Sequence, residues 1–334
     1  MQPLLYRHNE SFLLETGATL PELTIAYNTY GNPSNPVIWV CHALTANSDV
    51  AEWWPNTVAT GRFLDPEKYF IVCANVLGSH YGTTGPLSIN PNIGSPYYNS
   101  FPLITVRDMV KAHRLLAKYL GIEKIKTLIG SSLGGYQCLE WAIANPEVVD
   151  ELVLIATASK TTPWITAFNH TQRMAIESDA TFGHPNRNAG AKGMAAARAI
   201  ALLSYRGPVA YNRTQEDPDD SKMENHRVCS YQEHQGEKLV KRFNAYSYYR
   251  LTQTLDAHNV SRNRGKMENV LSSITARTLL VAISSDLLFP VGEHELMAKH
   301  IHGSTLRVID SDFAHDGFLV ESDKLNDIIL EFYG

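Results

Sequence analysis

Several features that would point to other classes of protein are scarce or absent in this chain of 334 residues. The four cysteines (Cys41, Cys73, Cys138 and Cys229) show no CxxC or other metal-ligand spacing, so no metal site is predicted and a reducing compartment is favoured. No basic block offsets the net charge of −5, which argues against nucleic acid as the main partner. No apolar run approaches the roughly 20 residues that span a bilayer. We therefore expect a cytoplasmic protein without a membrane partner.

The remaining composition is that of an ordinary globular protein. Hydrophobic residues make up 44% of the chain and charged residues 19%. A chain of this length can bury a large core, and one elaborated α/β domain explains it more simply than two independent domains. Residues 1–10 lack a basic segment followed by an apolar core, so we expect no signal peptide.

The most informative stretch is IKTLIGSSLGGYQCLEWAIANP, residues 125–146. It predicts a short buried strand, a tight turn at Gly130-Ser131-Ser132-Leu133-Gly134 and a helix that ends before Pro146. A serine within Gly-x-Ser-x-Gly, between a strand and a helix, is the nucleophile elbow of α/β-hydrolase folds, where small neighbours allow close packing around a strained serine. Taken alone, the motif could also be a glycine-rich turn without chemistry.

A serine nucleophile needs a base, and the base needs a third group that orients it. In this fold the acid and then the histidine follow the serine in the chain, each on a loop after a strand. The apolar run at 277–284 ends in Ser285-Asp286, and the alternating run at 305–311 leads into a loop that contains His315. We predict that Asp286 orients the imidazole of His315, and that His315 takes the proton of Ser132.

An oxyanion hole is predicted at the end of an early strand. Residues 37–41 form that strand, which runs into His42-Ala43-Leu44-Thr45. The backbone N–H of Leu44, together with that of Leu133 after the nucleophile, would stabilise the developing negative charge. Ala43 and Thr45 remain alternatives to Leu44. His42 is interpreted as a support of this loop rather than as a second base.

The fold class that these motifs predict is an α/β-hydrolase fold, with a mostly parallel central sheet, flanking helices and a helical lid. The catalytic core comprises residues 1–160 and 275–334, and the lid comprises residues 161–274, where the strand pattern disappears. An independent helical domain is less favoured, because the strands on both sides belong to one sheet. Lid helices are predicted at residues 164–176, 191–204, 235–244 and 246–255, with an acidic loop at 215–225.

Longer stretches carry a specific resemblance. They are CHALT (41–45), NVLG (75–78), GTTGPLSINP (82–91), FPLITVRDMV (101–110), GSSLGGYQCLEWA (130–142), FNHTQRMAI (168–176), ARAIALLSYR (197–206), SDLLFP (285–290) and AHDGFL (314–319). In this order, and over nearly the whole chain, the sequence resembles homoserine O-acetyltransferases of the α/β-hydrolase superfamily. It departs from the family at Gly78-Ser79-His80, where Gly-Gly-Cys is usual, at Ser131, where glycine is usual, and in a shorter lid.

The resemblance implies a ping-pong transfer, in which an acetyl group moves from acetyl-CoA to the hydroxyl of L-homoserine through a Ser132 acyl-enzyme, a step of methionine biosynthesis. It also implies that Arg173 binds the carboxylate of homoserine and that Asp316 binds its ammonium group. Coenzyme A is then a substrate, and no metal or tightly bound cofactor is implied. The family further suggests a homodimer that associates through the lid helices.

Alternatives remain open at this point. Succinyl-CoA could be the donor, serine could be the acceptor, or the same triad could serve a carboxylesterase or acetyl-hydrolase, because the acyl-enzyme is common to all of them. A catalytically inactive binding protein on this fold is disfavoured by the intact set of Ser132, Asp286 and His315.

Overall fold

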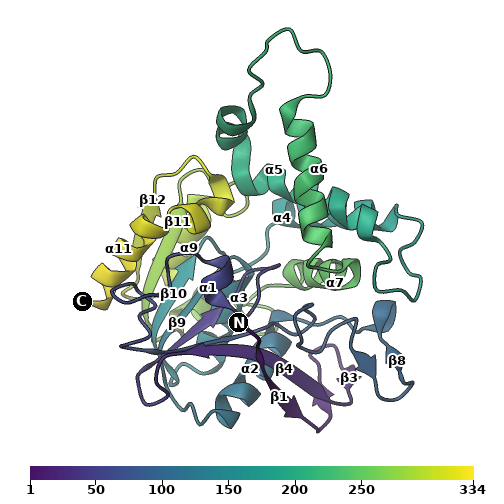
Figure 1. Cartoon of the computed structure of the whole chain (residues 1–334). Helices are drawn as coiled ribbons and strands as arrows, with labels where there is room; N and C mark the ends of the chain where they lie inside the picture. Colours follow the sequence, from purple (N-terminus) through teal and green to yellow (C-terminus); the bar gives the residue numbers. More distant parts are fainter.

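A computed structural model describes residues 1–334 and contains one central sheet of eight strands, in the order β1-β4-β6-β5-β9-β10-β11-β12 (Figure 1). The pairs β1–β4 and β4–β6 are antiparallel, and every other neighbouring pair is parallel. The strands are β1 (Leu4–His8), β4 (Leu23–Tyr30), β5 (Val37–Cys41), β6 (Phe70–Ala74), β9 (Ile125–Ser131), β10 (Val149–Ile155), β11 (Arg277–Ile283) and β12 (Thr305–Ile309). Two short ribbons flank it: β2 (Phe12–Leu13) with β3 (Thr19–Leu20), and β7 (Ile89–Asn90) with β8 (Ser95–Pro96).

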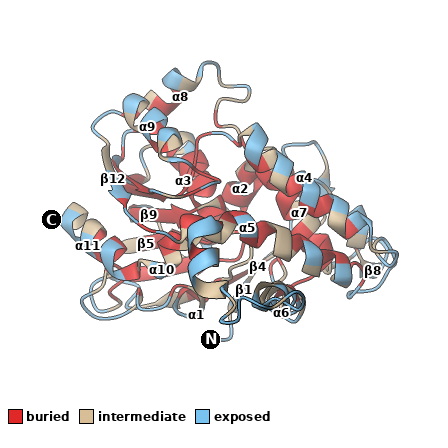
Figure 2. Cartoon of the chain, turned by 90° about the horizontal axis from the view of Figure 1, so that it is seen from above, coloured by how far each residue is buried: buried red, intermediate tan, exposed pale blue.

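The two faces of the sheet carry separate hydrophobic cores, because side chains alternate between the faces of each strand. In β5, Trp39 joins the larger core of 55 buried residues, whereas Ile38 and Val40 join the smaller core of 19. Figure 2 shows the buried strands between the surrounding helices. Helices α2 (Val106–Tyr119), α3 (Leu133–Ala144), α8 (Met267–Ser272) and α9 (Val291–His300) contribute to the larger core, and α10 (Gly317–Val320) and α11 (Ser322–Tyr333) to the smaller one.

Helix starts follow local sequence signals. Thr105 caps α2 in a reciprocal arrangement with Asp108, and Thr162 caps α4 immediately before Pro163. The short helix α1 (Val50–Trp53) and the 3₁₀ turns η1 (Tyr98–Ser100) and η2 (Ala314–Asp316) lie in the connections between larger elements. None of the helices combines the length and the apolar character needed to cross a membrane.

A helical insertion separates β10 from β11. It contains α4 (Pro163–Glu177), α5 (Ala191–Gln215), α6 (Arg227–Val240) and α7 (Ala245–Asp256), followed by α8. Figure 1 shows α4 to α7 as a layer beyond one end of the central strands. Helix α5 is kinked at Gly207, which has a positive φ of 66° and precedes Pro208. A Cβ at Gly207 would lie 3.0 Å from the Cβ of Ala314, so the kink packs directly against η2.

The predicted fold class is confirmed, but one strand and one helical segment were not predicted, and one helix was predicted with the wrong bounds. Strand β1 was not predicted, because its alternation is weak and most of its side chains are exposed. The helix predicted at 191–204 corresponds to the first segment of α5, in which the helical backbone breaks at Gly207; the second segment, which continues from Pro208 to Gln215, was not predicted. Helix α6 begins at Arg227 rather than at Gln235 and ends at Val240 rather than at Asn244, and few of its side chains are buried.

Candidate active site

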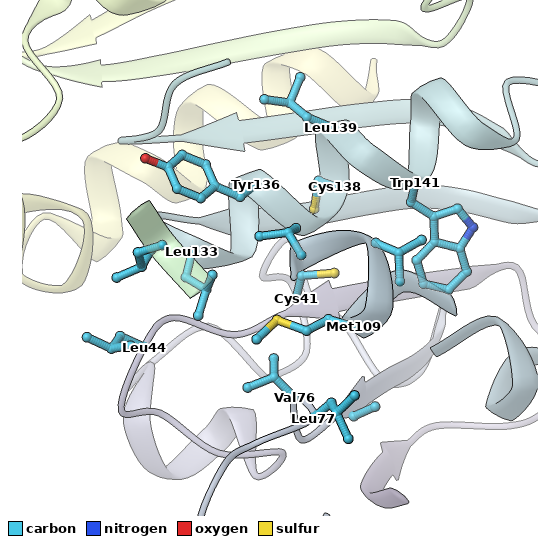
Figure 3. Packing of buried hydrophobic residues seen from close by; sticks show 14 of the residues in the cluster. Cys41, Leu44, Val76, Leu77, Met109, Leu133, Tyr136, Cys138, Leu139 and Trp141 are labelled. Carbon is cyan, nitrogen blue, oxygen red and sulfur yellow. The ribbon is translucent and has the colours of Figure 1, made fainter. Parts of the chain in front are cut away.

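Ser132 lies at the turn between β9 and α3 in a strained backbone conformation, with φ 54° and ψ −122°. The turn is tight because α3 approaches β5 closely. A Cβ on Gly134 would overlap the carbonyl oxygen of Cys41, so no larger residue fits at that position. Figure 3 shows the packing around this contact, with Cys41, Leu133 and Cys138 close together. The strand–turn–helix context of the Gly-x-Ser-x-Gly motif is therefore present.

Asp286 and His315 are brought into contact from two different loops, although they are 29 residues apart in the chain. His315 Nδ1 lies 2.8 Å from Asp286 Oδ2, and both residues are buried, with exposed fractions of 5% and 4%. Because an ionised carboxylate only accepts hydrogen bonds, Nδ1 must carry the proton. The other ring nitrogen, Nε2, is then left as a proton acceptor.

The second carboxylate oxygen of Asp286 is also occupied. Oδ1 accepts hydrogen bonds from the backbone N–H of Leu288 at 2.8 Å and of Phe289 at 3.0 Å. Burial by itself raises the pKa of the Asp286 carboxyl, but the facing imidazole and these hydrogen bonds outweigh it, so the pKa lies below its ordinary value. Asp286 is thus held as an anion that orients His315.

Ser132 and His315 line one cavity of about 410 Å³ at the edge of the sheet where the parallel strands end. Asp316, Leu44 and Tyr205 line the same cavity. A smaller recess next to Ser132 has only uncharged walls, formed by Leu44, Ile165, Phe168, Asn169, Gln172, Ser204, Tyr205, Leu255, Leu288 and Phe289. The nucleophile therefore faces an open cavity on one side and a narrow, largely apolar recess on the other.

The predicted oxyanion donors lie beside Ser132. Leu44 lines both the cavity and the recess, and its N–H makes no hydrogen bond within the chain. Leu133 is the first residue of α3, where backbone N–H groups lack an intrahelical acceptor. Figure 3 shows Leu44 and Leu133 on neighbouring segments. Both amides are thus available to a ligand on Ser132.

His42 holds the direction of the Leu44 amide. Its Nε2 accepts a hydrogen bond from the N–H of Val76 at 3.0 Å, so its Nδ1 carries the proton and donates to the carbonyl oxygen of Ala43 at 2.8 Å. This carbonyl belongs to the same planar peptide as the Leu44 N–H and points the opposite way. Burial lowers the pKa of His42 to about 4, so the ring is neutral near pH 7. The geometry fits a loop support, as predicted.

Arg173 does not line either cavity. It is 8% exposed and forms an ion pair through Nη2 with Asp256 Oδ2 at 2.6 Å. Its Nη1 is buried and has no hydrogen-bond partner, while its helix neighbours Asn169 and Gln172 line the recess. Arg173 therefore lies directly behind the wall of the recess, with one donor nitrogen unused.

Asp316 does line the cavity with Ser132, but it already has a cationic partner, since Arg206 Nε lies 3.1 Å from its Oδ2. Burial raises the pKa of Asp316 above its ordinary value, although the guanidinium groups of Arg198 and Arg206 act in the opposite direction. An ammonium group beside Asp316 would act in the same direction as these two cations.

Sequence reasoning missed three residues of this site: Asp256, Arg206 and Arg198. The first two hold Arg173 and Asp316, and Arg198 lines the cavity. These ion pairs join residues 83 and 110 positions apart, and no local pattern encodes them. Arg198 and Arg206 lie eight residues apart, about two helical turns, within the stretch 197–206, and this spacing was the only available signal. No group of three or more His, Cys, Asp or Glu side chains is arranged to hold a metal ion.

Known proteins place the chain in a family. A family model of the α/β hydrolase fold matches residues 36–322. A curated homoserine O-acetyltransferase of Cyclobacterium marinum is 45% identical over 328 residues, which cover 97% of this chain and 93% of that protein.

Solved structures agree on the fold. The crystal structure of a homoserine O-acetyltransferase from Bacillus anthracis has a TM-score of 0.90 at 21% identity, and the shared region covers 99% of this chain and 98% of that one. The esterase E22 has a TM-score of 0.91 at 22% identity, with 99% of both chains covered. Because both identities are low, these two structures support the fold alone. The sequence identity over nearly full length is what assigns the family, and the chain belongs to the homoserine O-acetyltransferases of the α/β hydrolase fold.

Proposed function

We propose that this chain transfers an acetyl group from acetyl-CoA to the hydroxyl of L-homoserine, a step of methionine biosynthesis, through an acyl-enzyme on Ser132. The observation that carries the proposal is the placement of Ser132 on a strained elbow in one cavity with the His315–Asp286 pair, in a chain that is 45% identical to a homoserine O-acetyltransferase. The function needs no cofactor, because coenzyme A is a substrate.

In the first half-reaction, Ser132 Oγ attacks the thioester carbonyl carbon while His315 Nε2 takes the hydroxyl proton. The carbonyl oxygen becomes an oxyanion, which accepts hydrogen bonds from the N–H groups of Leu44 and Leu133. Collapse of this intermediate breaks the C–S bond. His315 returns the proton to the departing thiolate, so free CoA leaves and Ser132 carries an acetyl ester.

In the second half-reaction, the homoserine hydroxyl loses its proton to His315 and attacks the acetyl carbon. The same two amides stabilise the oxyanion, the bond from carbon to Ser132 Oγ breaks, and His315 protonates Ser132. The products are O-acetyl-L-homoserine and the starting enzyme. Asp286 stays ionised throughout and stabilises the imidazolium that forms in each half-reaction.

The acceptor is a zwitterion, so its pocket must compensate two opposite charges. Arg173 supports a carboxylate site, because its Nη1 is buried without a partner while Asp256 holds the other end of the fork. Asn169 contacts the other oxygen of Asp256 at 2.8 Å and fixes this carboxylate. Asp316 lines the cavity beside His315 and supports an ammonium site, provided that the ammonium shares the carboxylate with Arg206.

The donor is a polyanion, and three cationic side chains line the cavity: Arg198, Lys238 and Arg242. All three come from the helical insertion or its turns, whereas Ser132 and His315 belong to the catalytic core. We therefore assign residues 161–274 as a lid that contributes charge to the donor side of the cavity, over a core of residues 1–160 and 275–334.

We also propose a cytoplasmic homodimer. All four cysteines are free, which suits a reducing compartment. The lid carries exposed apolar side chains on α4 and α5, namely Trp164, Met174, Leu203 and Val209, which supports association through these helices. Light scattering on the purified protein tests the dimer, and a mass of one chain at micromolar concentration contradicts it.

A product assay tests the function. Acetyl-CoA or succinyl-CoA is offered with homoserine, serine or water, and products are identified by mass spectrometry. We expect O-acetylhomoserine to form fastest, with slow hydrolysis in the absence of homoserine. Faster release of free acetate in the presence of homoserine would indicate an acetyl-hydrolase, and preferred succinyl transfer would overturn the donor assignment.

A further inference from the structure

The turn between α6 and α7 lies against the loop that carries the Leu44 amide. Arg242, in this turn, donates from Nη1 to the carbonyl oxygen of Thr45 at 2.5 Å and from Nη2 to Thr45 Oγ1 at 3.3 Å. The same Nη1 donates to the hydroxyl of Tyr81 at 2.8 Å. One guanidinium of the insertion thus binds both the backbone and the side chain of the residue that follows Leu44.

The Leu44 N–H is consequently held from two sides. On the core side, the carbonyl oxygen of Ala43 accepts from His42 Nδ1 and from the N–H of Ala46 at 3.1 Å, and Gln137 Nε2 donates to the carbonyl oxygen of His42 at 3.2 Å. On the insertion side, Thr45 has only Arg242 as a partner for its carbonyl oxygen and hydroxyl. The Thr45 carbonyl belongs to the same peptide as the Ala46 N–H, and that N–H donates to the carbonyl oxygen of Ala43, in the peptide that carries the Leu44 N–H. Without Arg242 the Thr45–Ala46 peptide loses its partner on the insertion side, and one of the two hydrogen bonds that orient the Ala43 carbonyl would loosen.

The turn itself is anchored on the loop that follows β6. Asn244 Nδ2 donates to His80 Nδ1 at 2.9 Å, and the ring of Phe243 packs against the rings of His80 and Tyr81, with centroids 5.8 Å apart in both pairs. His80 and Tyr81 belong to the loop after β6. His80 is therefore part of the contact that places Arg242.

We propose that Arg242 is a positioning residue for the oxyanion hole: it fixes Thr45, and through Thr45 it aims the Leu44 N–H at the oxyanion on Ser132. The proposal rests on the acyl-enzyme mechanism through Ser132 but not on the identity of the donor or the acceptor. It makes the competence of the catalytic core depend on a docked insertion. The Leu44 amide would be loosely held whenever the turn between α6 and α7 moves away.

Arg242 also lines the cavity, so a contact with the phosphate groups of coenzyme A must be separated from the positioning role. An uncharged ester substrate separates these two roles of Arg242. Hydrolysis of p-nitrophenyl acetate passes through the same oxyanion on Ser132 but offers no phosphate to a cation. A donor contact would change the KM for acetyl-CoA alone, whereas a positioning role changes kcat for both acyl donors.

The test compares Arg242→Gln with Lys241→Gln, which removes the same charge from the neighbouring residue. Lys241 is exposed and its side chain forms no hydrogen bond or ion pair. With p-nitrophenyl acetate we expect Arg242→Gln to lower kcat about 10- to 100-fold, with KM changed less than about threefold, since loss of a whole oxyanion donor costs about 10²–10³-fold. Lys241→Gln should stay within about twofold of the parent. Arg242→Lys should lose most of the rate, because a point charge cannot replace the planar fork.

Two further measurements test whether the loss of rate comes from the oxyanion hole. The affinity for a trifluoromethyl ketone, which forms an oxyanion on Ser132, should fall by the same factor as kcat/KM in Arg242→Gln. Tyr81→Phe removes one contact to Arg242 with little change in packing and should lower kcat about threefold. Full ester hydrolysis by Arg242→Gln, or full rescue by Arg242→Lys, overturns the assignment. Ser132→Ala tests the acyl-enzyme mechanism separately. If Ser132→Ala is inactive while Arg242→Gln is fully active, the acyl-enzyme mechanism stands and only the positioning role of Arg242 is refuted.

Discussion

Replacing Asp286 by asparagine tests whether the Asp286 carboxylate orients the imidazole of His315. The hydrogen bonds around residue 286 determine which way the new side-chain amide points. Oδ1 of Asp286 accepts two backbone N–H groups and Oδ2 faces His315 Nδ1. If the asparagine amide turned its NH₂ towards Leu288 and Phe289, two buried donors would lose their acceptor, at roughly 1–3 kcal/mol each. The carbonyl oxygen of the amide will therefore stay on the backbone side, and its NH₂ will face His315.

This orientation reverses the tautomer of the base. Nδ1 of His315 must accept a hydrogen bond from the amide, so the proton moves to Nε2, the nitrogen that has to receive the proton of Ser132. We expect kcat to fall by about 10⁴-fold, as in serine proteases with the same change, while both backbone hydrogen bonds and the fold persist. The assay is hydrolysis of p-nitrophenyl acetate, together with a thermal melt.

Asp312→Asn provides the matched control, because Asp312 lies on the same loop as His315 but is exposed and pairs only with Arg213. This variant should keep full activity. Asp286→Ala should lose similar activity and also stability, since it leaves two backbone amides without an acceptor. An Asp286→Asn variant within tenfold of the parent rate would show that Asp286 does not set the tautomer of His315.

Three other outcomes follow from the structure. Acetyl-CoA alone should add one acetyl group to the protein by intact mass, and Ser132→Ala should show neither this adduct nor transfer; an adduct that survives in Ser132→Ala would exclude this nucleophile. Arg173→Ala should weaken use of homoserine by on the order of 2–4 kcal/mol, while acylation by acetyl-CoA stays nearly intact; the reverse pattern would assign Arg173 to the donor or to the lid. Burial lowers the pKa of four histidines to about 3 or 4, namely His42, His113, His258 and His294. Because the unfolded chain binds these protons near pH 6.5 and the folded chain does not, the free energy of unfolding should fall as the pH drops from about 6.5 to 4, by at most about 1.4 kcal/mol per pH unit for each histidine. Urea unfolding at several pH values measures this slope, and a flat profile would contradict it.

The core of the fold was predictable because its signals are local. The unbroken apolar run in residues 37–41 and the glycines around Ser132 indicate a buried strand and an elbow without reference to the rest of the chain. The loops carrying Asp286 and His315 follow strands that the pattern also reveals, and parallel strands bring their ends to one edge of the sheet. The contact between the two side chains was therefore a consequence of topology.

The charge pairing of the site was not predictable in the same way. Arg173 and Asp256 meet because α4 packs on α7, and Asp316 meets Arg206 because α5 kinks against η2. Packing between helices of the insertion depends on many weak contacts, and a single sequence does not reveal which residues face each other. The resemblance implied that Arg173 binds a carboxylate, but it did not reveal that Asp256 holds the same guanidinium behind the wall of the recess.

The kink of α5 has a consequence for exchanging lids between enzymes of this fold. Gly207 adopts a positive φ where its backbone meets Ala314, which immediately precedes His315. A foreign insertion grafted between β10 and β11 would have to supply a residue without a side chain at this crossing, or it would push on the segment that carries the base. Chimeras in which residues 204–210 still come from the enzyme that supplies the catalytic core should therefore retain activity more often than chimeras with a completely foreign insertion. The junction between the two sequences is better placed within α5 than at either end of the insertion.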